Sequence, residues 1–108
     1  MNFNKFIRIS FNSEIEQLKI ENLKSCLIIG GAGTIGSNYL KQLLRFKPSK
    51  IVVVDFNENG LTELTRELRS SRLLDYNPKF ITYPVNLLSQ TFDKIFLSDE
   101  FELVANFS

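Results

Sequence analysis

The sequence predicts an α/β protein in which a parallel sheet is built from strands that alternate with helices. Two apolar runs, Leu27–Ile29 and Ile51–Val54, show no polar alternation, as expected of strands that are buried on both faces. Glycines follow the first run, and apolar residues at helical spacing follow the glycines. Strands that alternate with helices pair in parallel through right-handed crossovers, so we expect four strands in the order 3-2-1-4.

The glycines fit two forms of a dinucleotide-binding fingerprint, Gly31-x-Gly33-x-x-Gly36 and Gly30-x-x-Gly33-x-x-Gly36. Glycine lets the backbone turn sharply and lets a pyrophosphate approach without meeting a Cβ atom. The helix that follows would direct its free N–H groups and its positive dipole end at that phosphate. Gly33 and Gly36 belong to both forms, and the sequence leaves the choice between the two open.

An acid at the end of the second apolar run strengthens this interpretation. Asp55 lies 19 positions after Gly36, where a dinucleotide fold places the carboxylate that accepts hydrogen bonds from the adenosine ribose. A glycine fingerprint alone also fits an ordinary strand-to-helix turn, but strand, glycines, helix, strand and acid together favour a nucleotide site. A nucleotide-hydrolase loop is excluded, because Ser37 and not Lys follows the last glycine. The combination predicts a Rossmann-like fold.

Caps and periodicity place the other elements of this fold. Tyr39 recurs with apolar neighbours at helical spacing and is interpreted as helix packing, and Pro48 is expected to end that helix. Asn57 is a candidate cap for the next helix, whose first turn contains Gly60 at a cost of up to about 1 kcal/mol relative to Ala. The third strand is expected at residues 80–83, a short helix at 92–96 and the fourth strand at 102–106.

The first 24 residues are predicted to form a unit of their own. An extended segment is followed by a capping box at Ser13–Glu16 and by a one-sided helix that runs to about Asn22. We expect this extra N-terminal helix to pack on the edge of the fold. Residues 25–108 would then form the Rossmann half-domain itself.

Length, composition and net charge limit the functions that the chain could have. A length of 108 residues fits one small domain, and 44% hydrophobic with 23% charged residues is typical of a folded chain. The formal net charge of +1 provides no global field that would recruit nucleic acid or an anionic membrane. The densest basic group, Lys41 to Lys50, is interpreted as a solvated surface. Cys26 is the only cysteine and histidine is absent, so we expect no internal disulfide, no metal site and a reducing cytoplasm.

The run Leu27–Gly36 resembles the loop of extended short-chain dehydrogenase/reductases, and within them the polysaccharide-biosynthesis branch. That branch includes UDP-N-acetylglucosamine 4,6-dehydratases and related nucleotide-sugar epimerases. The phrases Asp55–Asn59 and Val104–Ser108 and the segment 6–23 are similar to it as well. The resemblance implies an NAD(P) site formed by the following residues: Gly30, Gly31, Gly33, Thr34, Ile35, Gly36, Asp55, Phe56, Asn57, Asn86 and Asn106.

The chain also departs from the pattern of these enzymes. Ile29 stands where extended members have Thr before the first glycine, and Asn86 stands where they have an Asp that contacts adenine. An Asn amide still offers an adenine edge both a donor and an acceptor. The Tyr-x-x-x-Lys pair of the family is missing, because the residues four positions after Tyr39, Tyr76 and Tyr83 are Leu, Phe and Leu. The resemblance therefore implies the cofactor-binding half of an enzyme, without catalytic residues.

Three interpretations are compatible with this sequence, and the third is a remnant domain that folds but binds nothing, which fold alone does not exclude. The first is the NAD-binding domain of a nucleotide-sugar dehydratase or epimerase, which would take its nucleotide-sugar substrate in a longer protein. The second is a stand-alone module that senses NAD(H) or another adenine nucleotide without catalysis. We expect NAD in preference to NADP, because Asp55 would face a 2′-phosphate and Phe56, Asn57 and Glu58 offer no cation. We also expect a homo-oligomer formed through the edge of the fourth strand, no membrane segment and no nucleic-acid partner.

Overall fold

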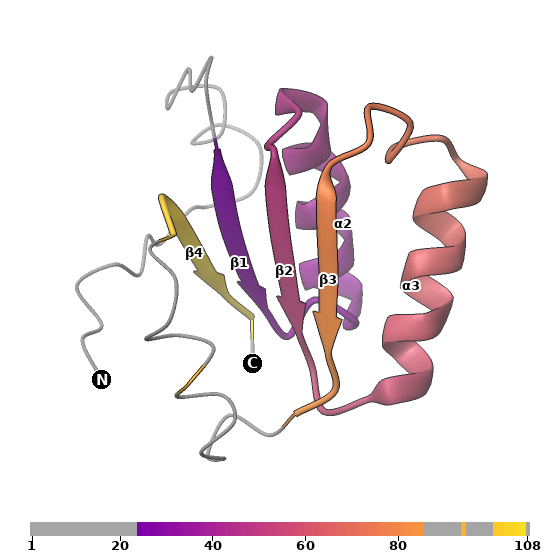
Figure 1. Ribbon diagram of the computed structural model, residues 1–108. Coiled ribbons are helices and arrows are strands. Elements are labelled where there is room, and N and C mark those ends of the chain that lie inside the picture. Colours follow the sequence, from indigo (N-terminus) through magenta and orange to yellow (C-terminus); the bar gives the residue numbers. More distant parts are fainter. Residues whose placement is uncertain (1–23, 86–93, 95–100, 108) are drawn as a thin grey trace.

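The computed structural model describes residues 24–85, 94 and 101–107, which form a parallel sheet of four strands with two α-helices (Figure 1). The elements in chain order are β1 (Ser25–Ile29), α2 (Thr34–Leu43), the 3₁₀ helix η2 (Leu44–Phe46), β2 (Lys50–Val54), α3 (Glu58–Ser70), β3 (Lys79–Tyr83) and β4 (Leu103–Asn106). The strand order is β3-β2-β1-β4, with every neighbouring pair parallel. This confirms the predicted Rossmann-like sheet.

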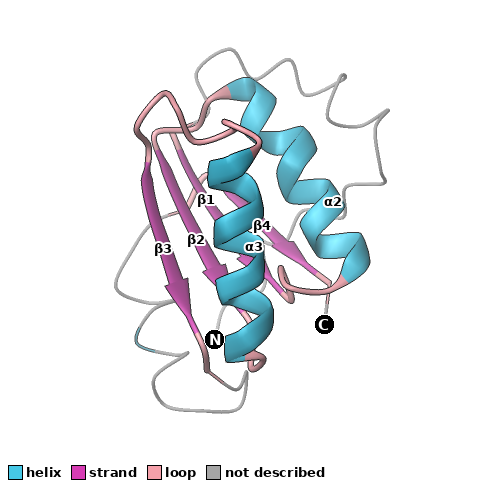
Figure 2. Cartoon of the chain, turned by 90° about the vertical axis from the view of Figure 1, so that its right-hand side faces the viewer, coloured by secondary structure: helices cyan, strands magenta, loops and turns pink. Residues whose placement is uncertain are grey.

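Strands β1 and β2 are buried on both faces, as their unbroken apolar runs predict, whereas β3 is partly exposed along its length. Both helices lie over one face (Figure 2), where Ile28, Val53 and Ala105 pack against apolar side chains of α2 and α3. Side chains of the alternate positions point to the other face and form a second apolar cluster, which includes Leu27 and Val52. None of these five side chains is more than 2% exposed.

The helix α2 ends earlier than Pro48 alone predicts. Its α-helical part stops at Leu43, and the chain tightens into η2 before Lys47 takes a left-handed conformation with φ of 54°. A residue that precedes proline is disfavoured in the right-handed helical region, so the helix must close before Lys47. Tyr39 is fully buried within α2, which confirms its interpretation as packing.

Asn57 caps α3 as predicted, because its side-chain Oδ1 accepts a hydrogen bond of 2.9 Å from the N–H of Gly60. The two helices are joined across their exposed sides by an ion pair between Lys41 and Glu67. Strand β2 ends at Val54, so that Asp55 lies just beyond the strand.

Several expectations fall outside the described residues. These are the capping box at Ser13–Glu16, the extra N-terminal helix, almost all of the short helix at 92–96, and Asn86. Within the residues that the structure does describe, no helix is long and apolar enough to cross a bilayer.

Candidate functional site

The turn after β1 depends on a glycine at its first position. Gly30 has a φ of +77°, a left-handed conformation that side chains rarely adopt. Its N–H donates a hydrogen bond of 2.7 Å to the carbonyl oxygen of Val54, so the turn is anchored to the end of β2. The backbone then leads directly into α2.

The other glycines of the loop differ in what a side chain at their positions would contact. A Cβ atom on Gly36 would lie 2.3 Å from the carbonyl oxygen of Gly30, and one on Gly31 would lie 2.3 Å from Cγ1 of Val53. Both glycines therefore allow close packing within the protein. A Cβ atom on Gly33 would meet nothing nearer than the carbonyl oxygen of Gly30 at 3.6 Å, an ordinary contact, and its φ of −73° suits any residue.

This contrast chooses between the two forms of the fingerprint. Gly30 makes the turn and Gly36 permits close contact between helix and loop, which are the first and third roles in a dinucleotide fingerprint. Gly33 occupies the middle position, where the backbone stays open. The spacing Gly30-x-x-Gly33-x-x-Gly36 is thus the one that matches the geometry, while Gly31 serves packing on β2.

The N-terminus of α2 is open to an acceptor. Gly33 is the N-cap and provides no side-chain cap, and the first turn contains no acid. The first hydrogen bond of the helical type runs from the N–H of Ser37 to the carbonyl oxygen of Gly33. The N–H groups of Thr34, Ile35 and Gly36 therefore have no acceptor within the helix, and they add to its positive dipole end.

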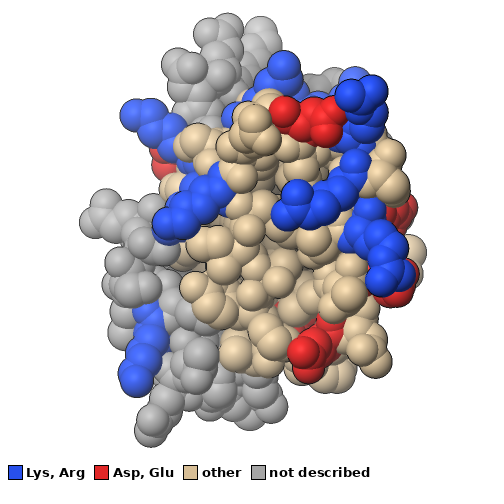
Figure 3. All heavy atoms as spheres, turned by 45° about the vertical axis from the view of Figure 1, so that its right-hand side comes forward, with Lys and Arg blue, Asp and Glu red and all other residues tan. Residues whose placement is uncertain are grey.

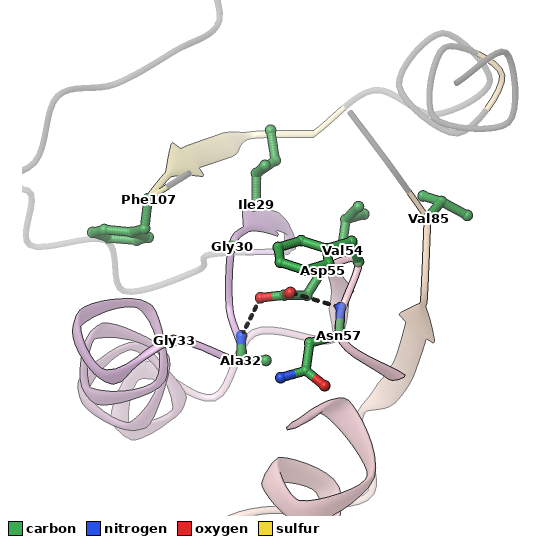
Figure 4. A pocket seen from close by; sticks show the side chains of 10 residues that line it. Ile29, Gly30, Ala32, Gly33, Val54, Asp55, Asn57, Val85 and Phe107 are labelled. Carbon is green, nitrogen blue, oxygen red and sulfur yellow. Dashed lines mark hydrogen bonds between the residues drawn. The ribbon is translucent and has the colours of Figure 1, made fainter. Parts of the chain in front are cut away.

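Asp55 fastens the two loops of the site together (Figure 4). Its Oδ2 accepts a hydrogen bond of 3.0 Å from the N–H of Ala32, and its Oδ1 accepts one of 3.0 Å from the N–H of Asn57. A carboxylate has about four acceptor positions, so each oxygen can still accept a bond from a ligand hydroxyl. The side chain is partly exposed at the cavity, where such a bond could form.

Gly60 lets the first turn of α3 approach the glycine loop. A Cβ atom on Gly60 would lie 3.0 Å from Cβ of Ala32 and 2.9 Å from Nδ2 of Asn57, both too close for comfortable packing. From the sequence, Gly60 was only a cost to the helix. A glycine in the first turn of a helix is itself the available signal of such a close approach.

These loops surround a cavity of about 610 Å³ at the carboxyl ends of the strands, within the size range of small-molecule sites. The residues that line it are Ile29, Gly30, Ala32, Gly33, Val54, Asp55, Phe56, Asn57, Val85 and Phe107. Figure 4 shows them arranged around the carboxylate. Five predicted site residues line the cavity: Gly30, Gly33, Asp55, Phe56 and Asn57. Phe56 lies at its rim with 83% of its surface exposed.

The other predicted residues lie nearby or outside the described chain. Thr34 and Ile35 form the exposed first turn of α2, and Ile35 is 67% exposed. Gly31 and Gly36 lie behind the loop, and Asn106 is the last residue of β4. Sequence reasoning missed five lining residues: Ile29, Ala32, Val54, Val85 and Phe107. Their shared signal is position, because parallel strands end at one edge of the sheet, where open α/β sheets bind their ligands.

Two groups with raised pKa values lie at the other end of the sheet. Burial, and then the charge of Glu102, raises the pKa of the Cys26 thiol to about 12. Burial also raises the pKa of Tyr76 to about 12, with a smaller contribution from Cys26, and the Tyr76 hydroxyl donates to the carbonyl oxygen of Pro48. Neither residue lines the cavity, so both serve the core.

The fold and the loop geometry define a Rossmann-like α/β protein with a glycine-turn cavity at the strand ends. Residues 26–102 match the model of a family described as polysaccharide biosynthesis protein, and the chain belongs to that family. It is also similar to an uncharacterized membrane protein of Methanocaldococcus jannaschii, with 46% identity over 50 residues. That segment covers 46% of this chain and 15% of the archaeal protein, so the match spans a small part of the relative's length.

Proposed function

We propose that this chain is the NAD-binding portion of a nucleotide-sugar dehydratase or epimerase of polysaccharide biosynthesis. The observation that supports this most is the open backbone at Gly33. The fold explains why Gly30, Gly31 and Gly36 are glycines, but no contact within the described protein requires a glycine at Gly33. A ligand that must lie against the backbone at that position accounts for it.

The residues around the cavity fit the parts of a dinucleotide. The pyrophosphate would lie over Gly33, where the N–H groups of Thr34 and Ile35 have no acceptor within the helix and no acid lies in the first turn. The adenosine ribose would lie at Asp55, whose oxygens have remaining acceptor capacity. The exposed ring of Phe56 and the side chain of Val85 offer apolar surface beyond it. When bound, NAD would accept a hydride from a sugar carbon.

The surroundings of Asp55 favour NAD over NADP. A 2′-phosphate would come close to the carboxylate, and Phe56, Asn57 and Glu58 supply no cation to offset that repulsion. One charge-assisted hydrogen bond from the ribose 2′-hydroxyl would contribute about 1.5–3 kcal/mol to NAD binding.

We infer that this chain binds the cofactor but does not turn over a sugar nucleotide by itself. It contains no Tyr-x-x-x-Lys pair and no histidine that could replace it. Positioned proton transfer contributes about 10²–10⁴-fold to a rate, and its absence leaves binding alone. The sugar-nucleotide substrate, a cytoplasmic location and self-association through β4 belong to the same proposal.

Calorimetric titration of the purified chain with NAD, NADP and ATP tests the proposal. We expect NAD to bind most tightly, and NADP to bind at least tenfold more weakly. No binding of NAD, or tighter binding of NADP, would overturn it. Turnover of UDP-N-acetylglucosamine by the chain with added NAD would refute the inference that the chain does not turn over a sugar nucleotide by itself.

A further inference from the structure

The structure gathers basic residues at the end of the sheet where the strands begin, opposite the cavity. Six cations lie there, and we call their surface the basic face: Lys24, Arg45, Lys47, Lys50, Arg72 and Lys79. All except Lys50 are exposed. The strands run downward in Figure 1, and Figure 3 is that view turned about its vertical axis; most of the blue surface lies in its upper part.

Backbone contacts place these residues next to one another although they are far apart in sequence. Lys50 pairs in register with Lys79 on the neighbouring strand, and the N–H of Lys50 donates to the carbonyl oxygen of Lys24. The starts of β1, β2 and β3 therefore present three lysines in a row. The loop that contains Arg72 is held at the same end, because the hydroxyl of Tyr76 in that loop donates a hydrogen bond to the carbonyl oxygen of Pro48, the residue after Lys47.

Acids only partly balance this surface. Asp75 pairs with Arg72 at 2.8 Å, and Glu102 accepts a hydrogen bond from the backbone N–H of Lys24. Among the described residues, these two are the acids at this end, against six cations. The remaining described cations and acids are equal in number, four of each. The positive excess of the described chain is therefore concentrated on the basic face, although the net charge of the whole chain is only +1.

Lys50 and Lys79 lie in register on adjacent strands, where like charges repel one another. Lys50 also lies over the ring of Phe101, whereas Lys79 forms no ion pair with another described residue. An anionic partner would relieve the repulsion. Four of the six cations are lysines, which act as point charges and lack the planar fork with which arginine recognises one phosphate group. These lysines are therefore better suited to an extended array of negative charges than to a single bound anion.

The shape of this end favours a membrane over a nucleic acid. Among the described residues it consists of strand starts, turns and the short helix η2, so no described helix or β-ribbon projects that could enter a groove. Single-stranded nucleic acid is bound by exposed aromatic rings between cations, but the nearby rings of Phe46, Tyr76 and Phe101 are partly or fully buried. Lysines on a surface of this kind are attracted by anionic lipid headgroups within a Debye length.

We propose that the basic face docks on the surface of a membrane that contains anionic lipids. The cavity lies at the opposite ends of the same strands, so a docked chain presents the cavity to the water phase. This proposal is independent of the cofactor, since no residue of the basic face lines the cavity.

Co-sedimentation of the full chain with vesicles tests this docking. The vesicles contain either phosphatidylcholine alone or equal amounts of phosphatidylcholine and phosphatidylserine. We expect binding to the anionic vesicles, weaker binding as salt is added, and none to phosphatidylcholine alone. The double variant Lys47→Gln/Lys79→Gln should bind about 25-fold more weakly, at about fivefold for each cation. Both side chains are exposed, and circular dichroism would verify that the variant is folded.

The matched control is Arg66→Gln/Lys94→Gln, which removes the same charge from exposed positions outside the basic face. It should bind within threefold of the unchanged chain. An equal loss in both variants would show that only net charge matters and would overturn the proposal. So would equal binding to both kinds of vesicle, or tighter binding of a DNA oligonucleotide than of anionic vesicles at the same salt concentration.

Discussion

Replacing Gly33 by Val separates the fold from ligand binding more cleanly than any other change in the loop. The added Cβ atom meets only the carbonyl oxygen of Gly30 at 3.6 Å, and φ of −73° with ψ of 168° is extended backbone that valine adopts readily. The change removes a favourable N-cap residue, which costs about 1 kcal/mol or less. We therefore expect the free energy of unfolding of Gly33→Val to stay within about 1 kcal/mol of the original value.

Binding should respond far more strongly than stability. The valine side chain would occupy the space where the pyrophosphate of the proposed cofactor would approach the N-terminus of α2, and would keep it from the N–H groups of Thr34 and Ile35. Each hydrogen bond to a charged group contributes about 1.5–3 kcal/mol, so the loss of one bond weakens binding about 10- to 150-fold. Displacement from both N–H groups would abolish measurable binding of NAD.

Thermal unfolding and calorimetric titration with NAD measure the two effects on the same samples. Gly36→Val serves as the contrasting variant, since its Cβ atom would lie 2.3 Å from the Gly30 carbonyl oxygen and the fold itself should be destabilised. If Gly33→Val binds NAD as tightly as the unchanged chain, the loop is only a turn and the reasoning fails. If Gly33→Val unfolds, the open space at this position has been misjudged.

Four further outcomes follow from the described contacts. Asp55→Asn should bind NAD at least tenfold more weakly and narrow its advantage over NADP in calorimetry, whereas an unchanged ratio of affinities would remove Asp55 from ribose recognition. Gly60→Ala should gain up to about 1 kcal/mol of helix propensity, while the new contact with Ala32 should displace the glycine loop and weaken NAD binding. An unchanged affinity for NAD would show that the glycine loop adapts to the added methyl group without cost. Burial raises the pKa of Cys26 from its usual 9.0 to about 12, so the thiol ionises first in the unfolded chain. The free energy of unfolding should therefore fall above pH 9 by up to about 1.4 kcal/mol per pH unit. Denaturant titrations of Cys26→Ala should show a smaller slope. Since β4 ends the described sheet, sedimentation velocity should detect self-association as concentration rises, and a monomer at every concentration would contradict pairing through that edge.

Local pattern was sufficient to predict most of the sheet and part of the site. The unbroken apolar runs predicted β1 and β2, because a strand with one face in water typically alternates apolar and polar residues. The spacing to Asp55 predicted a carboxylate at the cavity. Asn57 was predicted as a cap from residue type and position, and its side chain makes that bond. These features depend on short stretches of sequence and on the general geometry of parallel strands.

Features that depend on contacts across the fold could not be read in this way. The roles of Gly31 and Gly33 differ only in what a Cβ atom would meet, and the decisive neighbour of Gly31 is Val53 on another strand. The basic face forms because strand register brings Lys50 beside Lys79, whereas in the sequence the basic residues are scattered. Periodicity along one segment contains no information about either contact.

The two hydrogen bonds that Asp55 accepts have a consequence for redesign of the proposed cofactor preference. Replacing this acid by a neutral or basic residue would remove repulsion toward a 2′-phosphate, but it would also take away the acceptor shared by the N–H groups of Ala32 and Asn57. The glycine loop and the loop after β2 would then lose their common tether. Under the proposed function, a switch to NADP would need two coordinated replacements, one that supplies a cation and another that restores an acceptor for Ala32.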